Sequence, residues 1–350
     1  MTNTGLLSAN KSKKDEFYTQ LSDIKKELIY YTDFFKDKIV FCNCDDPYES
    51  NFFKYFATNF HVLGLKRLIT TCYAGSSLAY SDPDVLPLFQ KQANRNAKKP
   101  YSTDITSSMF LTNNHHEIDL GIIKKILEED RDALSILSGD GDFRSEEAIE
   151  RLIESDVVVT NPPFSLFREF IAQLEKYHKK FLVIGNVNAL SYQEIFPLIK
   201  ENRLWLGKSI HSGDREFRVP DDYPLEAAGC RIGNDGKKYI RVKGVRWFTN
   251  IDYPERYQTL NLTAKYSPEK YPKYDNYPAV NVDKVSDIPC DYDGEMGVPI
   301  TFLDKYNPQQ FAIIGMMAST QKTQYNFGYP YLHGKKKYAR IIIKRKLHAK

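Results

Sequence analysis

The tetrapeptide Asn161-Pro162-Pro163-Phe164 directly follows the apolar run 157–160, and this junction constrains the fold more than any other part of the chain. The run has the length and β-branched composition of a buried strand. Two consecutive prolines donate no backbone hydrogen bonds, so the strand must end there. A helical pattern follows over residues 166–177. The sequence therefore predicts a buried strand, a short loop at its carboxyl end and a helix, in that order.

The loop carries groups suited to an amine substrate. An exocyclic amine on a heteroaromatic ring is a poor nucleophile because its lone pair is delocalised, and acceptors aimed at its hydrogens return electron density to the nitrogen. The Asn161 side-chain oxygen and the Pro162 carbonyl are two such acceptors, and Pro163 restricts the direction of that carbonyl. Phe164 offers an apolar face to a planar ring. The pattern indicates methyl transfer to an amino nitrogen; the alternative is a turn that only ends a strand.

Further apolar runs alternate with helical patterns in the N-terminal part of the chain. Strands are expected over 37–44, 66–73, 133–137 and 181–185, and helices over 49–60, 145–154 and 192–200. This alternation predicts an α/β fold with a parallel sheet, helices on both faces and a ligand at the carboxyl ends of the strands. Segment 74–130 is longer than an ordinary connection, so we expect either an inserted helical unit or a loop that gates the substrate site.

The composition changes after about residue 206, where Gly, Pro, Tyr and charged residues dominate. Helical periodicity fades, and Tyr-Pro pairs punctuate a loop-rich stretch over 252–288. Strands are expected over 299–303, 311–316 and 339–343. We therefore expect a catalytic domain over 1–250, with the insertion at about 74–130, and a strand- and loop-rich region over 251–350.

Composition excludes several classes of protein. With 350 residues, 42% of them hydrophobic, the chain can bury one large core or two unequal ones, so it is neither disordered nor fibrous. No run approaches the roughly 18 apolar residues of a membrane span, and the start lacks the core of a signal peptide. The five cysteines show no CxxC spacing, so neither disulfides nor a metal site is expected: Cys42, Cys44, Cys72, Cys230 and Cys290. We expect a soluble, cytoplasmic protein.

The net charge is only +4, but the basic residues are clustered. One cluster lies in the insertion, and a second begins at residue 335 and continues to Lys346. Such clusters bind phosphates in many proteins, and otherwise they form solvated faces. The residues we single out as phosphate contacts are Lys91, Arg95, Lys98, Lys99, Lys335, Lys336 and Lys337.

Six tracts, in order along most of the chain, resemble the EcoRI-type adenine-specific DNA methyltransferases, which use S-adenosylmethionine. The resemblance lies in the ordered set, because tetrapeptides like Asn161 to Phe164 also occur in amine methyltransferases that act on rRNA or on protein glutamine. The tracts are Asp15 to Thr19, Cys44 to Ser50, Gly139 to Phe143, Asn161 to Phe164, Gly244 to Asn250, and Pro299 to Tyr306.

The resemblance implies a Rossmann-like class I methyltransferase domain, S-adenosylmethionine as cofactor, and a role for each tract. The first would hold the methionine end of the cofactor, the second its ammonium group, and the third its adenine. Either aspartate-containing tract is also suited to capping a helix. The cofactor residues so implied are Phe17, Tyr18, Thr19, Asp45, Asp46, Pro47, Asp142 and Phe143, and the catalytic ones are Asn161, Pro162, Pro163 and Phe164.

The mechanism implied by the resemblance begins with double-stranded DNA held through its phosphates. One adenine rotates out of the stack, because a buried base cannot be reached otherwise. Its nitrogen then attacks the methyl group in line, with neither metal nor general base. Region 251–350 would recognise the target sequence. The family likeness also implies a monomer, in a restriction-modification or orphan modification system whose cognate endonuclease, where present, is encoded separately.

Two departures from the family pattern leave alternatives open. The first-strand loop has Glu49, Ser50 and Asn51 where most class I methyltransferases have glycines. The second strand ends in Thr70-Thr71-Cys72, without an acid for the ribose hydroxyls, so Glu49 or another group must make that contact. The alternatives are an RNA amino-group methyltransferase of the rRNA guanine type and a catalytically inactive DNA-binding module.

Overall fold

A computed structural model describes residues 17–47, 50–72, 100–111, 118–130, 132–211, 214–219, 223, 226 and 229–346. Its packing divides the chain into two compact units. Unit 1 combines the residues up to 187 with 212–251, and unit 2 combines 188–211 with the residues from 252 onward. The chain therefore passes from unit 1 to unit 2 and back before it ends in unit 2.

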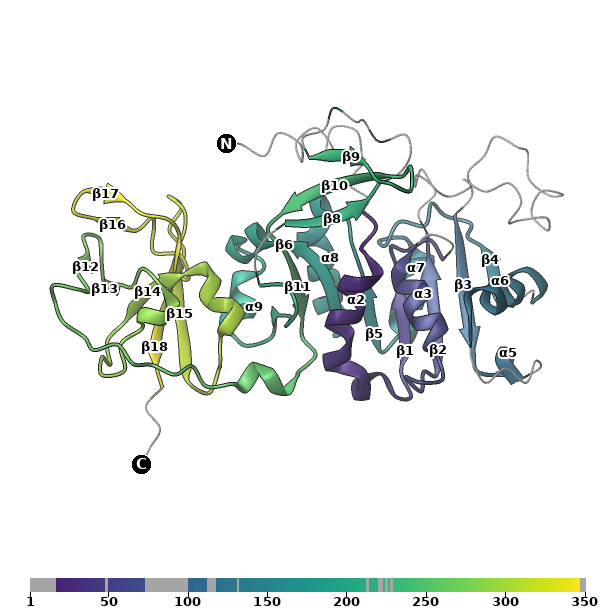
Figure 1. The fold of residues 1–350 in the computed structure, drawn as a ribbon, viewed down its shortest axis with the longest axis horizontal. Helices are drawn as coiled ribbons and strands as arrows, with labels where there is room; N and C mark the ends of the chain where they lie inside the picture. Colours follow the sequence, from purple (N-terminus) through teal and green to yellow (C-terminus); the bar gives the residue numbers. More distant parts are fainter. Residues whose placement is uncertain are drawn as a thin grey trace. The chain divides into compact units, whose positions relative to one another are not determined.

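Unit 1 is built on a mixed sheet with the strand order β4-β3-β2-β1-β5-β6-β11 (Figure 1). Its four central strands run parallel, whereas β3 and β11 run antiparallel to their inner neighbours. The strands are β1 (Ile39–Cys42), β2 (Arg67–Thr71), β3 (Tyr101–Thr106), β4 (Leu134–Ile136), β5 (Val157–Thr160), β6 (Lys180–Asn186) and β11 (Val245–Thr249).

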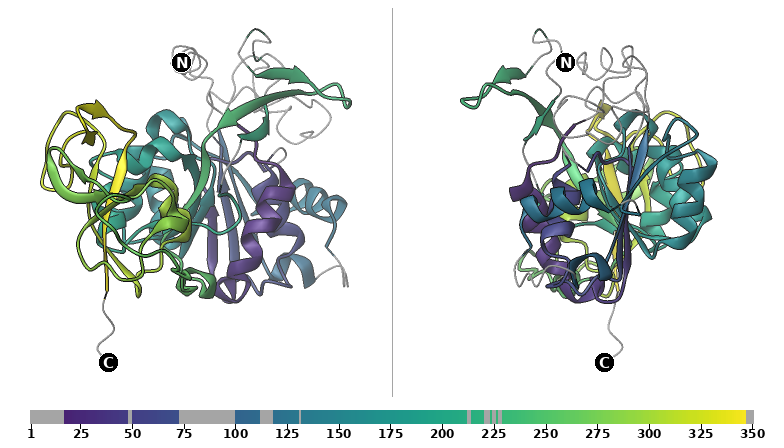
Figure 2. Two further views of the ribbon diagram at one scale, coloured as in Figure 1. Left: turned by 60° about the vertical axis from the view of Figure 1, so that its left-hand side comes forward. Right: turned by 90° about the vertical axis from the view of Figure 1, so that its right-hand side faces the viewer.

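Helices cover both faces of this sheet, and for that reason the central strands are buried at consecutive positions rather than at alternate ones. The right-hand view of Figure 2 looks along the edge of the sheet and shows α2 and α3, in purple and blue, on one side and α8, in teal, on the other. The helices are α2 (Leu21–Leu28), α3 (Asn51–Thr58), α5 (Ser108–Leu111), α6 (Leu120–Glu129), α7 (Glu146–Glu154) and α8 (Phe167–Lys176), with the 3-10 helix η1 (Ile29–Phe35) after α2. No helix among the described residues is long and apolar enough to cross a membrane.

The insertion contains a strand that the sequence analysis missed. β3 lies between β2 and β4, so the expectation of a purely helical unit or a gating loop was wrong for residues 101–106. Polar contacts attach it: the Thr70 and Thr103 hydroxyl oxygens are 2.6 Å apart, and Arg67 pairs with Asp104. A hydrophobic pattern does not report such contacts. Residues 73–99 lie outside the described part of the chain.

Residues 214–251 belong to unit 1 despite the change of composition near residue 206. β11 joins the large sheet beside β6 and runs antiparallel to it, so the sheet is not the purely parallel one predicted from the sequence. The preceding residues form a separate three-stranded antiparallel ribbon in the order β8-β10-β9. Its strands are β8 (Asp214–Arg218), β9 (Cys230–Ile232) and β10 (Lys238–Lys243).

Unit 2 is built on a five-stranded sheet in the order β12-β13-β14-β18-β15. The strands expected near 311–316 and 339–343 are confirmed as β15 and β18, but 300–305 is a 3-10 helix, because Pro299 ends β14. The strands are β12 (Lys273–Tyr274), β13 (Tyr277–Asn281), β14 (Met296–Pro299), β15 (Phe311–Met317) and β18 (Arg340–Arg345), with the hairpin β16 (Tyr331–Leu332) and β17 (Lys335–Lys336). The other elements are α9 (Phe196–Lys200), β7 (Trp205–Leu206), and the 3-10 helices η3 (Val187–Ser191), η4 (Pro254–Tyr257), η5 (Val285–Asp287) and η6 (Ile300–Lys305).

Candidate active site

The strand, loop and helix predicted around Asn161 are confirmed. All four residues of β5 are buried, and the chain leaves the sheet at Asn161. Pro163 then precedes the short 3-10 helix η2 (Phe164–Leu166), which continues into α8. The amide of Leu166 donates to the Pro163 carbonyl over 3.0 Å and closes the turn. The loop is thereby fixed at the carboxyl end of a central parallel strand, where α/β sheets bind ligands.

The side chain of Asn161 has one end bonded and the other open. Its Nδ2 donates to the backbone carbonyl of Phe17. Only the nitrogen of the amide can donate, so this bond sets which way the group faces. The Oδ1 atom is buried and has no hydrogen-bond partner among the described residues. Asn161 therefore presents a buried, open acceptor.

Three aromatic rings, one of them from the loop itself, form a chain of contacts here. Phe17 contacts Phe164 edge-on, with ring centroids 5.7 Å apart, and it also contacts Phe217 of β8 at 5.7 Å. Tyr18 exchanges backbone hydrogen bonds with Arg218, at 2.9 and 3.2 Å. The structure thus brings the N-terminal tract next to the Asn161 loop and ties both to the ribbon.

Asp45 links the loop after β1 to the end of β5. Its Oδ1 accepts from the Ser50 hydroxyl and its Oδ2 from the Thr160 hydroxyl, each over 2.5 Å. Burial raises the pKa of the Asp45 carboxyl to about 6, against the opposing effect of these two hydrogen bonds. Asp46 and Pro47 follow it, and both are buried. Among the described residues, no lysine or arginine forms an ion pair with Asp45.

Ser50 also begins the helix that follows this loop. Its hydroxyl oxygen accepts from the amides of Phe52 and Phe53, at 3.1 and 3.3 Å, and so caps α3. Asn51, in the first turn, donates from Nδ2 to the Thr19 carbonyl over 2.7 Å. Thr19 is buried, and its hydroxyl has no partner among the described residues. Thr19 therefore provides a second open polar atom near the loop after β1.

The tract Gly139 to Phe143 packs against the end of β2. Gly141 has a φ of +75°, and a Cβ on it would lie 2.1 Å from the Cys72 carbonyl oxygen, so only glycine fits there. The Asp142 carboxylate accepts from the Arg144 guanidinium, at 2.8 Å on each oxygen. The Phe143 ring is buried and meets Phe170 of α8 edge-on at 5.1 Å.

The other residues singled out from the sequence belong to unit 2, to the end of β2 or to the part of the chain that the structure does not describe. Lys335, Lys336 and Lys337 are exposed or half-buried on the β16–β17 hairpin of unit 2, where the Lys336 ammonium lies 3.2 Å from the Tyr329 ring centroid. Lys91, Arg95, Lys98 and Lys99 lie outside the described residues, as does Glu49. The hydroxyls that end β2 are used inside the sheet: Thr70 meets Thr103, and Thr71 donates to the Asn43 carbonyl over 3.2 Å.

Sequence reasoning assigned no individual role in the site to Ser50, Thr160 or Phe217, although Ser50 ends the second family tract. Ser50 precedes a run of aromatic helix formers, which is the pattern of an N-cap and gives a usable signal. Thr160 is the only polar residue in a valine run. Phe217 carries no signal of its own, because it stands among charged residues in a short strand.

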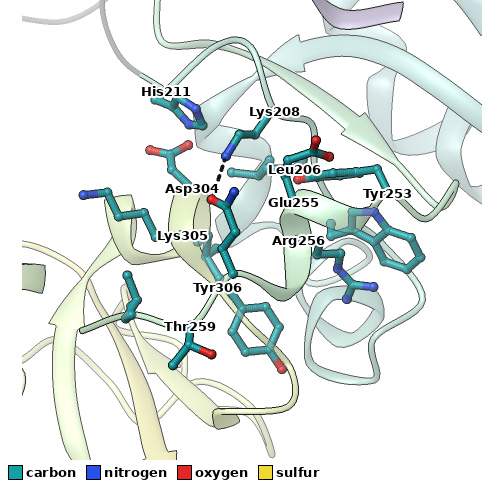
Figure 3. A pocket seen from close by; sticks show the side chains of 14 residues that line it. Leu206, Lys208, His211, Tyr253, Glu255, Arg256, Thr259, Asp304, Lys305 and Tyr306 are labelled. Carbon is teal, nitrogen blue, oxygen red and sulfur yellow. Dashed lines mark hydrogen bonds between the residues drawn. The ribbon is translucent and has the colours of Figure 1, made fainter. Parts of the chain in front are cut away.

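Unit 2 contains a cavity of about 300 Å³ that holds none of the predicted site residues. Lys208, His211 and Asp304 lie together at one end of it (Figure 3). At its wall, the Arg256 guanidinium stacks 3.6 Å from the Trp205 ring centroid. The cavity therefore has a polar end and an aromatic wall within unit 2.

Comparisons with known proteins cover nearly the whole chain. Residues 5–346 match the family described as adenine-specific methyltransferase EcoRI. The Type II methyltransferase M.EcoRI of Escherichia coli is 46% identical over 349 residues, covering 99% of this chain and 97% of the relative. M.MpnI of Mycoplasma pneumoniae is 36% identical over 353 residues, covering 97% of each chain. M.MgeORF184P of Mycoplasma genitalium is also 36% identical, over 352 residues, covering 96% and 97%. No solved structure matches the chain significantly.

Proposed function

The chain belongs to the EcoRI family of adenine-specific methyltransferases and is a DNA adenine methyltransferase, and we propose that it transfers the methyl group of S-adenosylmethionine to N6 of an adenine in duplex DNA. The target adenine would be turned out of the helix, since N6 cannot be reached by a methyl donor inside the stack. A Rossmann-like arrangement of unit 1, with the donor across the carboxyl ends of β1 and β5, is part of the same proposal.

The observation that carries the proposal is the open Oδ1 of Asn161. A buried acceptor without a partner costs about 1–3 kcal/mol, so its persistence next to a fixed loop suggests that a ligand satisfies it. The adenine amine supplies two hydrogens. Asn161 Oδ1 would accept one and the Pro162 carbonyl the other, which returns electron density to the nitrogen. The bond from Asn161 Nδ2 to Phe17 keeps the oxygen, rather than the nitrogen, turned to the substrate.

The same residues account for the remaining requirements of the reaction. Phe164 offers a ring on which the extruded base stacks, a contact worth about 1–3 kcal/mol. The loop positions the nitrogen for in-line attack, and positioning with charge stabilisation supplies the rate. The proton released from the methylated amine passes to water without a dedicated base. S-adenosylmethionine supplies an electrophilic methyl group when bound.

The residues around the loop fit such a donor. Asp45 is buried without a cationic partner among the described residues, so an ammonium or sulfonium group would stabilise its charged form and lower its pKa from about 6. The open hydroxyl of Thr19 would bind a polar group of the donor. We propose that Phe17, Tyr18, Asp46, Pro47, Asp142 and Phe143 complete the donor site.

Recognition of the DNA sequence is proposed for region 251–350, with domain 1–250 performing the transfer. Lys335, Lys336 and Lys337 would contact phosphates there, and Lys91, Arg95, Lys98 and Lys99 would do so from the insertion. The protein would act as a monomer, with any cognate endonuclease made as a separate chain.

The test compares adenine methylation by the unaltered chain and by Asn161→Ala, read by single-molecule sequencing of plasmid DNA from cells without their own adenine methylases. Asn59→Ala is the matched control, since Asn59 Nδ2 also donates to a backbone carbonyl, that of Tyr55, over 2.8 Å. We expect modified adenine at one short motif with the unaltered chain and the control, and none with Asn161→Ala, whose donor affinity should persist.

Absence of modified adenine with the folded, unaltered chain would overturn the proposal. Methylation of rRNA alone would then select the RNA enzyme, and DNA binding without donor binding would select the inactive module. Wild-type methylation by Asn161→Ala would refute the role of its Oδ1.

A further inference from the structure

The ribbon β8–β10–β9 is attached directly beside the Asn161 loop. Its first strand pairs with the N-terminal tract through the Tyr18 and Arg218 backbone bonds. Phe217 of that strand contacts Phe17, whose carbonyl holds Asn161. Figure 1 shows the ribbon at the same edge of the sheet as the carboxyl ends of the parallel strands. Phe17 therefore links Phe217 of the ribbon to Asn161.

The two faces of the ribbon differ in character. Phe217, Ile240 and Val242 are buried on one face, as alternation along a strand requires. On the other face, Tyr239 lies in register with Arg218 on one side and Arg231 on the other. The next residue of β10 on this face is Arg241, which is exposed. The outward face thus carries three arginines, Arg218, Arg231 and Arg241.

The acidic side chains on that face are already paired, and they leave the arginines able to bind a further anion. Glu216 accepts from Arg231 at 2.7 and 2.8 Å, and Asp214 pairs with Arg241 at 2.8 Å. The two arginine side chains are 55% and 69% exposed, and ion pairs this exposed contribute little stability. A guanidinium carries five N–H donors. The bonds from Arg231 to Glu216 use two of them, and three remain for another acceptor.

The ends of the ribbon add two further cations. Lys243 at the root and Lys237 beside the turn are both exposed. The turn itself projects freely, because a Cβ built on Gly236 would meet nothing within 4 Å. A β-ribbon is one of the two elements that fit the major groove of B-DNA, and clustered cations on such an element neutralise phosphates.

We propose that the outward face of the ribbon binds the sugar-phosphate backbone of the substrate duplex, with Arg231, Arg241 and Lys243 making the contacts. The inference rests on the proposed function, in which a DNA substrate places its phosphates beside the Asn161 loop. Phosphate contacts fix register and orientation on the duplex rather than sequence. The ribbon is joined to Asn161 through Phe217 and Phe17. Phosphate contacts made by the ribbon would therefore place the target adenine opposite the Asn161 loop.

The experiment measures binding of a fluorescein-labelled duplex by anisotropy from 50 to 300 mM salt, with full-length protein. The double variant Arg231→Gln/Arg241→Gln should weaken binding at least ~10-fold at low salt and reduce the slope of log K against log salt by about 2. The matched control, Lys36→Gln/Lys66→Gln, removes the same charge at the amino ends of β1 and β2 and should leave both quantities unchanged.

A second variant has the opposite expected effect, so misfolding cannot produce it. Asp214→Asn/Glu216→Gln removes the competing carboxylates and should tighten duplex binding several-fold. Unchanged affinity and salt slope in the arginine variant would overturn the proposal, as would weaker binding in the carboxylate variant. If the unaltered protein methylates adenine but the arginine substitutions leave duplex binding unchanged, the role of the ribbon is refuted and the proposed function stands. If the substitutions weaken duplex binding but the unaltered protein methylates no adenine, the proposed function is refuted and the role of the ribbon stands.

Discussion

Asp45 should make the stability of this protein depend on pH in an unusual direction. Burial raises the pKa of its carboxyl from 3.8 to about 6, even though Ser50 and Thr160 each donate a hydrogen bond to it. Between these two pH values the folded state binds more protons at this site than the unfolded chain. The contribution of Asp45 to the free energy of unfolding therefore falls as the pH rises through this window.

The size of the effect follows from the shift in pKa. A shift of about 2 units, at about 1.4 kcal/mol per unit, gives about 3 kcal/mol in all. Part of this contribution to the free energy of unfolding is already lost below pH 5, and about 1.4 kcal/mol is lost between pH 5 and pH 8. The variant Asp45→Asn has no ionisable group at this position. The offset caused by its amide hydrogens, one of which faces the Thr160 hydroxyl, is the same at every pH.

The assay is urea denaturation of both proteins at pH 5 and pH 8 without methyl donor. We expect the free energy of unfolding of Asp45→Asn, relative to the unaltered protein, to be higher at pH 8 than at pH 5 by about 1.4 kcal/mol. Asp142→Asn is the control. Burial alone would raise the pKa of Asp142, but the hydrogen bonds and charge of Arg144 hold it below its ordinary value. Its stabilising contribution is therefore lost only at lower pH, and the control difference should be flat. A flat difference for Asp45→Asn as well would refute the reasoning.

Three further substitutions test the geometry of the site. Gly141→Ala should lower the free energy of unfolding by at least about 2 kcal/mol, because its φ is positive and the new Cβ meets the Cys72 carbonyl; an unchanged urea midpoint would contradict this. Thr160→Val should lower it by about 1.5–3 kcal/mol at pH 8, and by less at pH 5, where more of Asp45 is protonated in the folded state. Phe164→Ala should reduce kcat/KM for adenine methylation by about 5- to 150-fold while calorimetry shows intact donor binding; equal losses in both would indicate a collapsed site.

The order of elements around the Asn161 loop was predictable because its signals are local. Four buried residues in a row, two prolines and a helical pattern each act on the chain within a few positions. The helices after residues 50 and 145 were predictable for the same reason, since Ser50 and Ser145 cap them from the adjacent position. Strand ends, prolines and helix caps each act on the backbone within a few residues, so a local sequence pattern is enough to predict them.

β3 and the ribbon were not predictable in the same way. β3 is a largely polar strand that pairs with β2 along its length, and hydroxyl contacts and the ion pair of Arg67 with Asp104 add to this pairing. The ribbon strands are short and charged, so the change of composition near residue 206 obscured their attachment to unit 1. A hydrophobic period reports burial along one segment and carries no information about which polar side chains meet across two segments.

The sequence by itself determined that a buried strand ends at Asn161. It also determined that the loop offers two acceptors, the Asn161 side-chain oxygen and the Pro162 carbonyl, followed by the aromatic ring of Phe164. Only the tertiary structure decided which way the Asn161 amide faces and what surrounds it. The Phe17 carbonyl that orients it lies 144 residues earlier, and the carboxylate that accepts from Thr160 lies 115 residues earlier. Contacts at such separations exist only once the strand order brings β1, β5 and the N-terminal tract together. The order is set by packing of the whole sheet rather than by any local pattern.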